Sequence, residues 1–244
     1  MQGVSKLDNF NSENECRRVK PTNYWPLNND GKDIVGSGST TSCVQGTCTG
    51  TTSSCISSIC TGSNGCNCYP DYDRFGNPNS AVTFMSSAYS LPPGIYFNTN
   101  FTVTAWIYLY QAQAILIDFS NGDSLDTTIL EVNSDNQLEE IFYSESIGAG
   151  SSLFTKISAP KSTALNLNTW YHVAFIGSDN GFLKIYLNGL LVSKYKGTYP
   201  SKISTGLNFF GGNSQKATYD DIRIFNTALK PCQIMNEYVI TNSK

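Results

Sequence analysis

The segment from residue 168 to residue 229 constrains the fold more than any other part of this chain. Asn188-Gly189 stands between two apolar segments, 170–176 and 182–187, and this dipeptide supplies the positive φ that both central positions of a type I′ turn require. A further apolar segment, 219–225, follows the Gly211-Gly212 pair. The segment therefore predicts a β-hairpin followed by a third strand.

Residues 101–110 show the clearest strand alternation. Phe101, Val103 and Ile107 fall on one face, and Trp106 and Tyr108 on the other. Since both faces carry large apolar side chains, we expect this strand to lie inside the fold with little water on either side. Shorter segments bounded by Asn, Asp or Gly indicate further antiparallel strands at 114–119, 127–132, 138–143 and 153–157.

The motifs NTWYHVA, IYLNG, GGN and DDIRIFNTAL, read in order from Asn168, resemble the laminin G-like, concanavalin A-like jelly-roll family. Two earlier segments, YWPLNNDGKDIVGSG from Tyr24 and a strand reaching Phe84, resemble the opening elements of that family. The resemblance covers Tyr24 to Tyr238 apart from an insertion. It implies an all-β fold, an antiparallel two-sheet β-sandwich of the concanavalin A-like jelly-roll type, with a short C-terminal helical turn at 230–238.

We expect one domain at residues 21–240, because sandwiches of about this length are often single domains. Residues 1–20 are polar and irregular, and they predict an N-terminal arm. The segment 36–69 is rich in Cys, Ser, Thr and Gly, and we expect it to be an insertion within the domain.

Composition excludes two classes of partner. Charged residues make up 14% of the chain and the net charge is −3, so no basic stripe is available to follow a phosphate backbone. No run of about 18 apolar residues predicts a membrane-spanning helix. We therefore expect neither nucleic-acid binding nor membrane insertion.

Cysteine usage favours an oxidising compartment. Six of the eight cysteines lie in a tract with a 12-residue repeat, in which CVQGTCTG is echoed by CISSICTG. A tract of Ser, Thr and Gly cannot bury enough apolar surface to hold itself in place, whereas disulfides can constrain it. We expect a stapled loop, with zinc as the less favoured alternative because the tract contains no histidine. The six cysteines are Cys43, Cys48, Cys55, Cys60, Cys66 and Cys68.

Cys16 and Cys232 remain near the two ends of the fold. Jelly rolls of the resembled type bring the N- and C-terminal strands side by side, so the resemblance favours a Cys16–Cys232 disulfide. The connectivity of eight cysteines cannot be deduced from sequence, and this pairing is a preference.

The disulfides predict an extracellular protein, secreted or displayed on the cell surface. The first residues contain no apolar core of a signal peptide, so we expect the chain to be a mature or excised fragment of a longer secreted protein. Asn100-Phe101-Thr102 is a sequon for N-glycosylation at Asn100, and the Ser/Thr tract could carry O-glycans.

No catalytic motif is present. His172 is the only histidine, it lies in a predicted strand, and no Gly-x-Ser-x-Gly motif accompanies it. Glucanases of the resembled group place closely spaced acidic residues on one strand face, and Glu139, Glu140 and Glu145 do not reproduce that spacing. We expect no enzyme, and Asp220 is expected to accept backbone hydrogen bonds near a strand end.

Calcium is the cofactor that the sequence favours. The segment DFSNGDSLD gathers several oxygen ligands in one predicted hairpin, as hard cations require, although Asn-Gly-Asp is also ordinary turn chemistry. Calcium-binding members of the resembled family imply Asp123 or Asp126 as one ligand and Asn213 as another.

The predicted function is a non-catalytic adhesion or recognition module whose partners are glycans or extracellular proteins. Sugar binding would use exposed aromatic residues, and the candidates are Tyr89, Tyr96, Tyr143, Tyr195 and Tyr199. The alternative is a structural subunit that self-associates into an extracellular filament, coat or matrix through the arm, the edge strands and the stapled loop.

Overall fold

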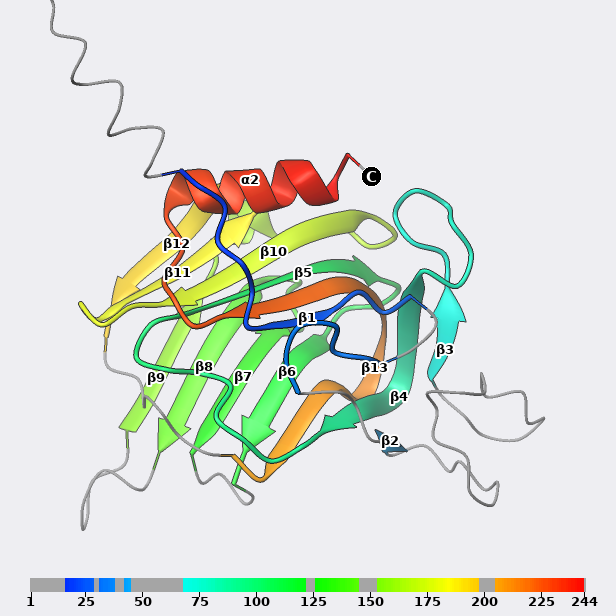
Figure 1. The fold of residues 1–244 in the computed structure, drawn as a ribbon, viewed down its shortest axis with the longest axis horizontal. Coiled ribbons are helices and arrows are strands. Elements are labelled where there is room, and N and C mark those ends of the chain that lie inside the picture. Colours follow the sequence, from blue (N-terminus) through cyan, green and yellow to red (C-terminus); the bar gives the residue numbers. More distant parts are fainter. Residues whose placement is uncertain are drawn as a thin grey trace, which may run out of the picture.

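The computed structural model describes residues 16–28, 31–37, 42–44, 68–121, 126–144, 153–197 and 205–243. Within these ranges the chain folds mainly into antiparallel strands, with one α-helix at the C-terminal end (Figure 1). The elements are β1 (Asn23–Trp25), β2 (Ser42–Val44), β3 (Cys68–Asp71), β4 (Ala81–Leu91), β5 (Phe101–Leu109), β6 (Ala114–Ser120), β7 (Thr127–Val132), β8 (Leu138–Ser144), β9 (Leu153–Ser158), the 3₁₀ turn η1 (Lys161–Thr163), β10 (Trp170–Gly177), β11 (Phe182–Leu187), β12 (Leu190–Lys196), β13 (Leu207–Phe225) and α2 (Pro231–Thr241).

Two sheets form a sandwich, and two long strands pass from one sheet into the other. The first sheet contains β12-β11-β10-β5 and the C-terminal half of β13, while the second contains the N-terminal half of β13 followed by β6-β7-β8-β9. β4 pairs with both halves of β13, and the register shifts between Gly212 and Lys216. The strand predicted at 219–225 is therefore the end of a longer strand, and the Gly211-Gly212 pair lies within it.

The core lies between the sheets. On β5, the alternating residues Phe101, Val103, Ala105, Ile107 and Leu109 are at most 1% exposed and belong to this core. They meet the inward-facing side chains of the second sheet, which gives the fold the two apolar layers of a sandwich. The predicted fold class and most predicted strand positions are confirmed.

The helix α2 covers the outer face of the first sheet. Ile234 and Leu229 pack there against Ile176 and Tyr186, in a cluster separate from the main core. The predicted C-terminal helical segment, 230–238, is confirmed, and α2 continues to Thr241 because an apolar outer face stabilises an 11-residue helix. As expected, β5 has little exposed surface on either face, and only Tyr108 is not buried. The element that covers its second face, as far as Trp106, is α2.

The two ends of the described chain are joined at α2. Cys16 and Cys232 form a disulfide, as predicted. Beside it, Nδ2 of Asn236 donates to the Cys16 carbonyl and Nε2 of Gln233 donates to the Arg17 carbonyl, both at 2.9 Å. The first described residues, Cys16 and Arg17, are thus linked to α2 by a disulfide and by hydrogen bonds.

The predicted type I′ turn is confirmed. Asn188 and Gly189 have φ values of 49° and 79° and connect β11 to β12. A Cβ at position 189 would stand 2.9 Å from the Met235 sulfur, so the turn needs glycine both for its backbone and for its approach to α2.

Candidate ligand-binding face

A row of directly opposed residues crosses five strands on the outer face of the first sheet. Trp170 on β10 pairs with Tyr108 on β5, which pairs with Thr218 on β13. Thr218 then pairs with Thr83 on β4, and Thr83 pairs with Tyr69 on β3. Since opposed residues of antiparallel strands point to the same side of a sheet, these five side chains share one face.

The helix α2 covers the neighbouring row on the same face of the sheet and ends before the row that contains Trp170 and Tyr108. The preceding row contains His172 and Trp106, which are 1% and 4% exposed and contact Tyr238 of α2 through their rings. Trp170 and Tyr108 are only half-buried. The C-terminal end of α2 is thus the boundary between a covered and an uncovered part of the same sheet.

Aromatic rings form most of the uncovered part. The ring centroids of Trp170 and Tyr108 are 5.6 Å apart, and those of Tyr108 and Tyr110 are 4.9 Å apart. Nζ of Lys216 lies 4.3 Å from the Tyr110 centroid. Together with half-buried Tyr69, these residues offer ring faces of the kind that small-molecule sites use for apolar contact. We call Trp170, Tyr108, Tyr110 and Tyr69 the aromatic face.

Hydroxyl groups and one carboxylate lie between the aromatic rings. Thr83 and Thr218 are buried with their Oγ1 atoms 2.5 Å apart, and Oγ1 of Thr83 donates to Oδ2 of Asp71 over 2.7 Å. The Tyr110 hydroxyl donates to the same oxygen over 3.1 Å. Burial raises the pKa of Tyr110, and burial together with the nearby Asp71 carboxylate raises the pKa of Tyr69. Both phenols are therefore neutral near pH 7 and retain their protons for hydrogen bonding.

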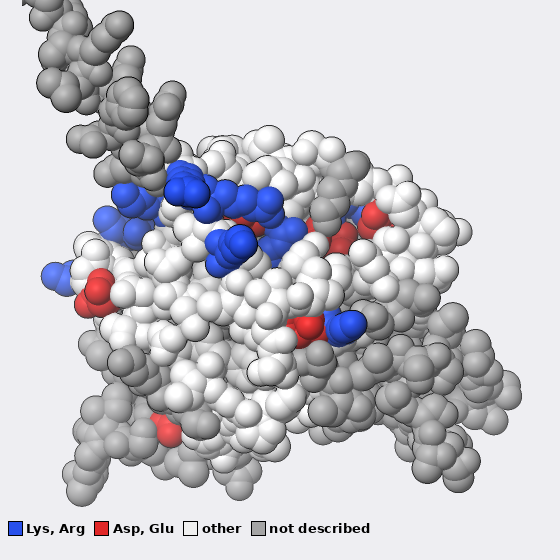
Figure 2. Space-filling view, in the orientation of Figure 1, with Lys and Arg blue, Asp and Glu red and all other residues white. Residues whose placement is uncertain are grey.

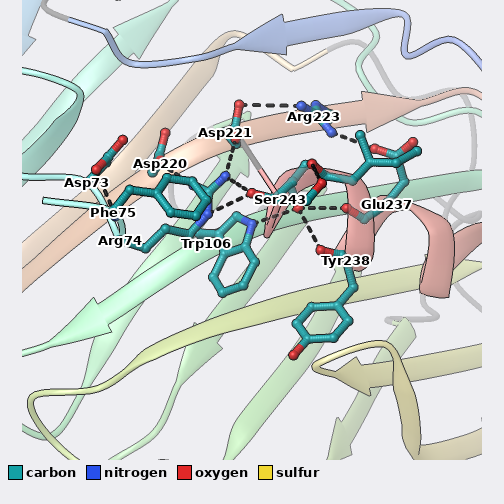
Figure 3. A network of polar contacts seen from close by, with 12 residues as sticks. Asp73, Arg74, Phe75, Trp106, Asp220, Asp221, Arg223, Glu237, Tyr238 and Ser243 are labelled. Carbon is teal, nitrogen blue, oxygen red and sulfur yellow. Dashed lines mark hydrogen bonds and ion pairs between the residues drawn. The ribbon is translucent and has the colours of Figure 1, made fainter. Parts of the chain in front are cut away.

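A buried ionic network packs against Trp106 of the neighbouring row, on the same face of the sheet (Figure 3). The Arg74 guanidinium contacts the carboxylates of Asp220 and Asp221 and the Thr241 carbonyl, and it lies 4.6 Å from the Trp106 ring. Asp220, expected to accept backbone hydrogen bonds, thus has a guanidinium partner. These charges are buried and paired with one another, so the network is a structural support and not a binding surface.

Sequence reasoning missed the aromatic face. Of its own candidates, Tyr89 and Tyr96 are 4% and 7% exposed and belong to the core, so they are wrong. Tyr143 and Tyr195 are more exposed but lie on β8 and β12, away from the row, and Tyr199 lies outside the described residues. The sequence signal that could have identified it is the alternation along β5, which puts Tyr108 and Tyr110 on the face that points away from the core.

The acidic residues considered for catalysis point in different directions. Glu139 lies on the outer face of the second sheet, bound to Lys156, Ser158 and Asn133 at 2.7–2.8 Å. Glu140 points into the sandwich, where it is fully buried, and neither carboxylate oxygen has a hydrogen-bond partner. Glu145 is outside the described residues. Two carboxyl groups on opposite faces cannot act together on one glycosidic bond.

The only histidine is buried too. Burial and the positive charges of Arg223 and Arg74 lower the pKa of His172 to about 3, partly opposed by Asp221. His172 is therefore neutral and enclosed, without the access that a catalytic base requires.

The calcium candidates are only partly described. Asp123 and the side chain of Asn213 lie outside the described residues. Oδ2 of Asp126 accepts a hydrogen bond from Asn121 over 3.4 Å, and Oδ1 of Asn121 accepts one from the Gly206 amide over 2.9 Å. No group of three or more His, Cys, Asp or Glu side chains that could hold a metal occurs in the described ranges. Calcium binding stays a prediction.

Asn100 borders a polar hollow of about 340 Å³ at the other end of α2, near Asp179, Lys184 and Lys230. Its Oδ1 accepts a hydrogen bond from the Asp179 amide over 2.9 Å. Thr102, the third residue of the sequon, is buried, and its hydroxyl contacts the backbone of Thr227 and Leu229. Glycosylation at Asn100 stays a prediction.

The cysteine tract meets the described structure at Cys68. This residue is 3% exposed, packs in the core and is disulfide-bonded. Because Cys16 and Cys232 pair with each other, the partner of Cys68 is one of the other five cysteines, and a disulfide leaves no thiolate at Cys68 for zinc. The side chain of Cys43, and all of Cys48, Cys55, Cys60 and Cys66, lie outside the described residues.

Comparison with known proteins agrees with this architecture. A family model described as the concanavalin A-like lectin/glucanases superfamily matches residues 83–235, and the chain belongs to this superfamily. Comparison with curated protein sequences gives no match.

Three solved structures are similar in fold. Domain 4 of AbnA, an extracellular arabinanase from Geobacillus stearothermophilus in complex with arabinotriose, is 19% identical, with a TM-score of 0.63 over 90% of this chain and 98% of that one. The binding domain of Paraclostridial Mosquitocidal Protein 1 is 15% identical, with a TM-score of 0.61 over 87% of this chain and 50% of that one. The ligand-binding domain of botulinum neurotoxin serotype D, in complex with N-acetylneuraminic acid, is 16% identical, with a TM-score of 0.55 over 90% and 50%. This chain thus spans about half the length of the last two.

The surface carries few charges in the view of Figure 2. Figure 2 shows Lys and Arg side chains gathered on this face. Arg17, Arg18 and Lys20, near the start of the described chain, are exposed. Most of the remaining described surface in that view is uncharged. Among the described residues, the only α-helix is α2, and it is too short and polar to cross a membrane.

Proposed function

We propose that the protein is a non-catalytic glycan-recognition module that binds its ligand on the aromatic face. The observation that carries this proposal is the half-buried aromatic face between Trp170 and Tyr69, whose rings lie beside the partly exposed Asp71 carboxylate, with the hydroxyls of Thr83 and Thr218 buried beneath them. Ring faces suit the C–H faces of sugars, and Asp71 and the tyrosine hydroxyls suit sugar hydroxyls. Two of the similar structures were solved with saccharides bound, which adds support from fold-level analogy.

The proposed role includes adhesion or recognition outside the cell. The disulfide between Cys16 and Cys232 and the bonded state of Cys68 favour an oxidising compartment. The proposed domain spans residues 21–240, with 36–69 as an insertion within it.

Binding by the purified protein to a glycan array, followed by titration of the strongest ligand, tests the proposal. Trp170→Ala and Tyr108→Ala should each weaken binding by roughly tenfold or more, because aromatic residues dominate the binding energy of such sites. Tyr195→Ala is the matched control, since Tyr195 is a 49% exposed aromatic on β12. Equal losses in all three variants, or no glycan retained by the wild type, would exclude this site.

A second candidate function is self-association as a structural subunit. β12 is an edge strand that pairs only with β11 among the described strands, and Leu190, Leu191 and Tyr195 on it are 63%, 49% and 49% exposed. Exposed apolar edges are routes to strand addition between chains. Sedimentation of the pure protein as ordered polymers, without glycan binding, would favour this function over recognition.

A further inference from the structure

We infer that the aromatic face binds an uncharged, unbranched oligosaccharide that lies across the strands from Trp170 to Tyr69. This inference rests on the proposed function and specifies its ligand class. Neighbouring strands are about 4.8 Å apart, so the four steps of the row between these residues span about 19 Å. One sugar ring is much shorter than that distance and could contact only one end.

The order of side chains along the row fits a chain and not a single ring. Trp170, Tyr108 and Tyr110 form a continuous set of rings at one end, with centroids 5.6 Å and 4.9 Å apart. Tyr69 provides a ring at the other end. Thr83 and Thr218 are 0% and 1% exposed and lie beneath this surface, whereas the Tyr110 hydroxyl and the Asp71 carboxylate, 3.1 Å apart, lie between the two ends. A ligand that uses the whole row must offer apolar faces at two places and hydroxyls between them.

Charge favours a neutral ligand. The Asp71 carboxylate accepts hydrogen bonds from Thr83 and Tyr110 in the middle part of the row, over 2.7 Å and 3.1 Å. An acidic sugar placed there would meet a like charge, whereas a neutral sugar would offer hydroxyl donors. Lys216, on β13, lies over the ring of Tyr110 with Nζ 4.3 Å from the ring centroid.

The far end of the site is formed by β3. Tyr69 and Asp71 both belong to this strand, which begins at the buried and disulfide-bonded Cys68. β3 adds a fifth strand to the row, and its pairing with β4 places Tyr69 opposite Thr83. Without β3 the row would end at β4 and lose one of its aromatic ends.

The test is affinity as a function of chain length, measured calorimetrically with linear arabino-oligosaccharides and cello-oligosaccharides from the disaccharide to the hexasaccharide. For at least one series we expect affinity to rise by roughly tenfold or more with length and then level off. Tyr69→Ala should weaken binding of the longer oligosaccharides more than binding of the disaccharide and so remove most of that rise, and Tyr69→Phe, which keeps the ring, should preserve the rise.

The other outcomes separate this inference from the proposed function. Affinity that is independent of length, or unaltered by Tyr69→Ala in a folded variant, would overturn the extended mode and leave glycan recognition intact. Binding that depends on Trp170 but is restricted to acidic or branched glycans would likewise overturn the extended mode and leave glycan recognition intact. If no glycan binds, both fail. The length series on the wild type decides the matter even if Tyr69→Ala does not fold.

Discussion

Trp106 donates a hydrogen bond from its indole nitrogen to Oγ1 of Thr241 over 2.8 Å, and this contact joins the sheet to the last turn of α2. Both residues are at most 4% exposed. The contact lies where the helix stops covering the sheet, one row before the aromatic face. It therefore fixes both the position of the helix end and the edge of the candidate site.

Replacing Thr241 by valine tests how much this contact stabilises the fold. The change keeps the side-chain shape but leaves the buried indole N–H without its acceptor, which should lower the free energy of unfolding by about 1–3 kcal/mol. Urea denaturation would measure it. Ser243→Ala is the control, because that exposed hydroxyl contacts only the Ile240 carbonyl and its loss should change stability by less than about 0.5 kcal/mol. Equal losses of stability in Thr241→Val and Ser243→Ala would contradict a stabilising role for the Trp106–Thr241 hydrogen bond.

Arg74→Met should be among the most destabilising single substitutions. It removes the guanidinium that contacts both the Asp220 and Asp221 carboxylates, of which Asp221 keeps Arg223 as a partner, and breaking one side of a buried ion pair costs about 3–5 kcal/mol. The matched control is Arg18→Met, because the Arg18 side chain is 51% exposed in its contact with Glu237, and such pairs contribute about 0–1 kcal/mol. Similar urea midpoints for the two variants would show that Arg74 is not a support of the fold.

The strands of this protein are predictable wherever hydrophobic alternation is bounded by turn residues. The predicted segment 127–132 coincides with β7, and the Asn188-Gly189 turn forms as expected. Local pattern suffices at these places because side-chain period and turn chemistry are local properties.

The aromatic face is not predictable in the same way. Trp106 and Tyr108 alternate identically along β5, yet α2, more than 120 residues later, covers only the first of them. Likewise, Tyr69 stands beside Thr83 only through the pairing of β3 with β4. The exposure of Tyr108 and the position of Tyr69 beside Thr83 both depend on how segments far apart in the chain pair and pack. A single segment of sequence does not contain that information.

The calcium prediction can be checked by thermal unfolding with added calcium and with chelator. If Asp126 is a ligand, calcium should raise Tm, since a ligand at a hundred times its Kd adds about 2.7 kcal/mol to stability. Asp126→Asn should reduce this shift, whereas Asp179→Asn, on the turn between β10 and β11, should leave it unchanged. Superimposable melting curves in calcium and chelator would remove Asp123, Asp126 and Asn213 as ligands.

His172 provides a spectroscopic test of burial, because the chain contains no second histidine. With its pKa lowered to about 3 in the folded protein, the ring should stay neutral, and its carbon-bound proton resonances should not shift between about pH 8 and about pH 4.5. Because the unfolded state takes up the proton first, this residue removes stability as pH falls below its ordinary value of 6.5. The same resonances in urea-unfolded protein serve as the control and should titrate normally. A folded-state midpoint near 6.5 would show that the ring is accessible.

Glu139 and Glu140 are adjacent, point to opposite faces and should respond to pH with opposite signs. Burial without a hydrogen-bond partner raises the pKa of Glu140 well above its ordinary value, so the folded state keeps this proton after the unfolded state has lost it. Stability should therefore fall as pH rises above the ordinary value of 4.5, by at most about 1.4 kcal/mol per pH unit, until the folded carboxyl ionises. Glu140→Gln should remove this loss and make the protein more stable than wild type near pH 7.

Glu139→Gln is the matched variant for that comparison. Burial alone would raise the pKa of Glu139, but hydrogen bonds from Lys156, Ser158 and Asn133 outweigh it and lower the pKa. Its contribution to stability is therefore present above pH 4.5 and lost as pH falls through the folded-state pKa. Near pH 7, urea denaturation should show Glu139→Gln less stable than wild type and Glu140→Gln more stable. Shifts of the same sign in both variants would contradict the opposite pKa shifts of the two carboxyl groups.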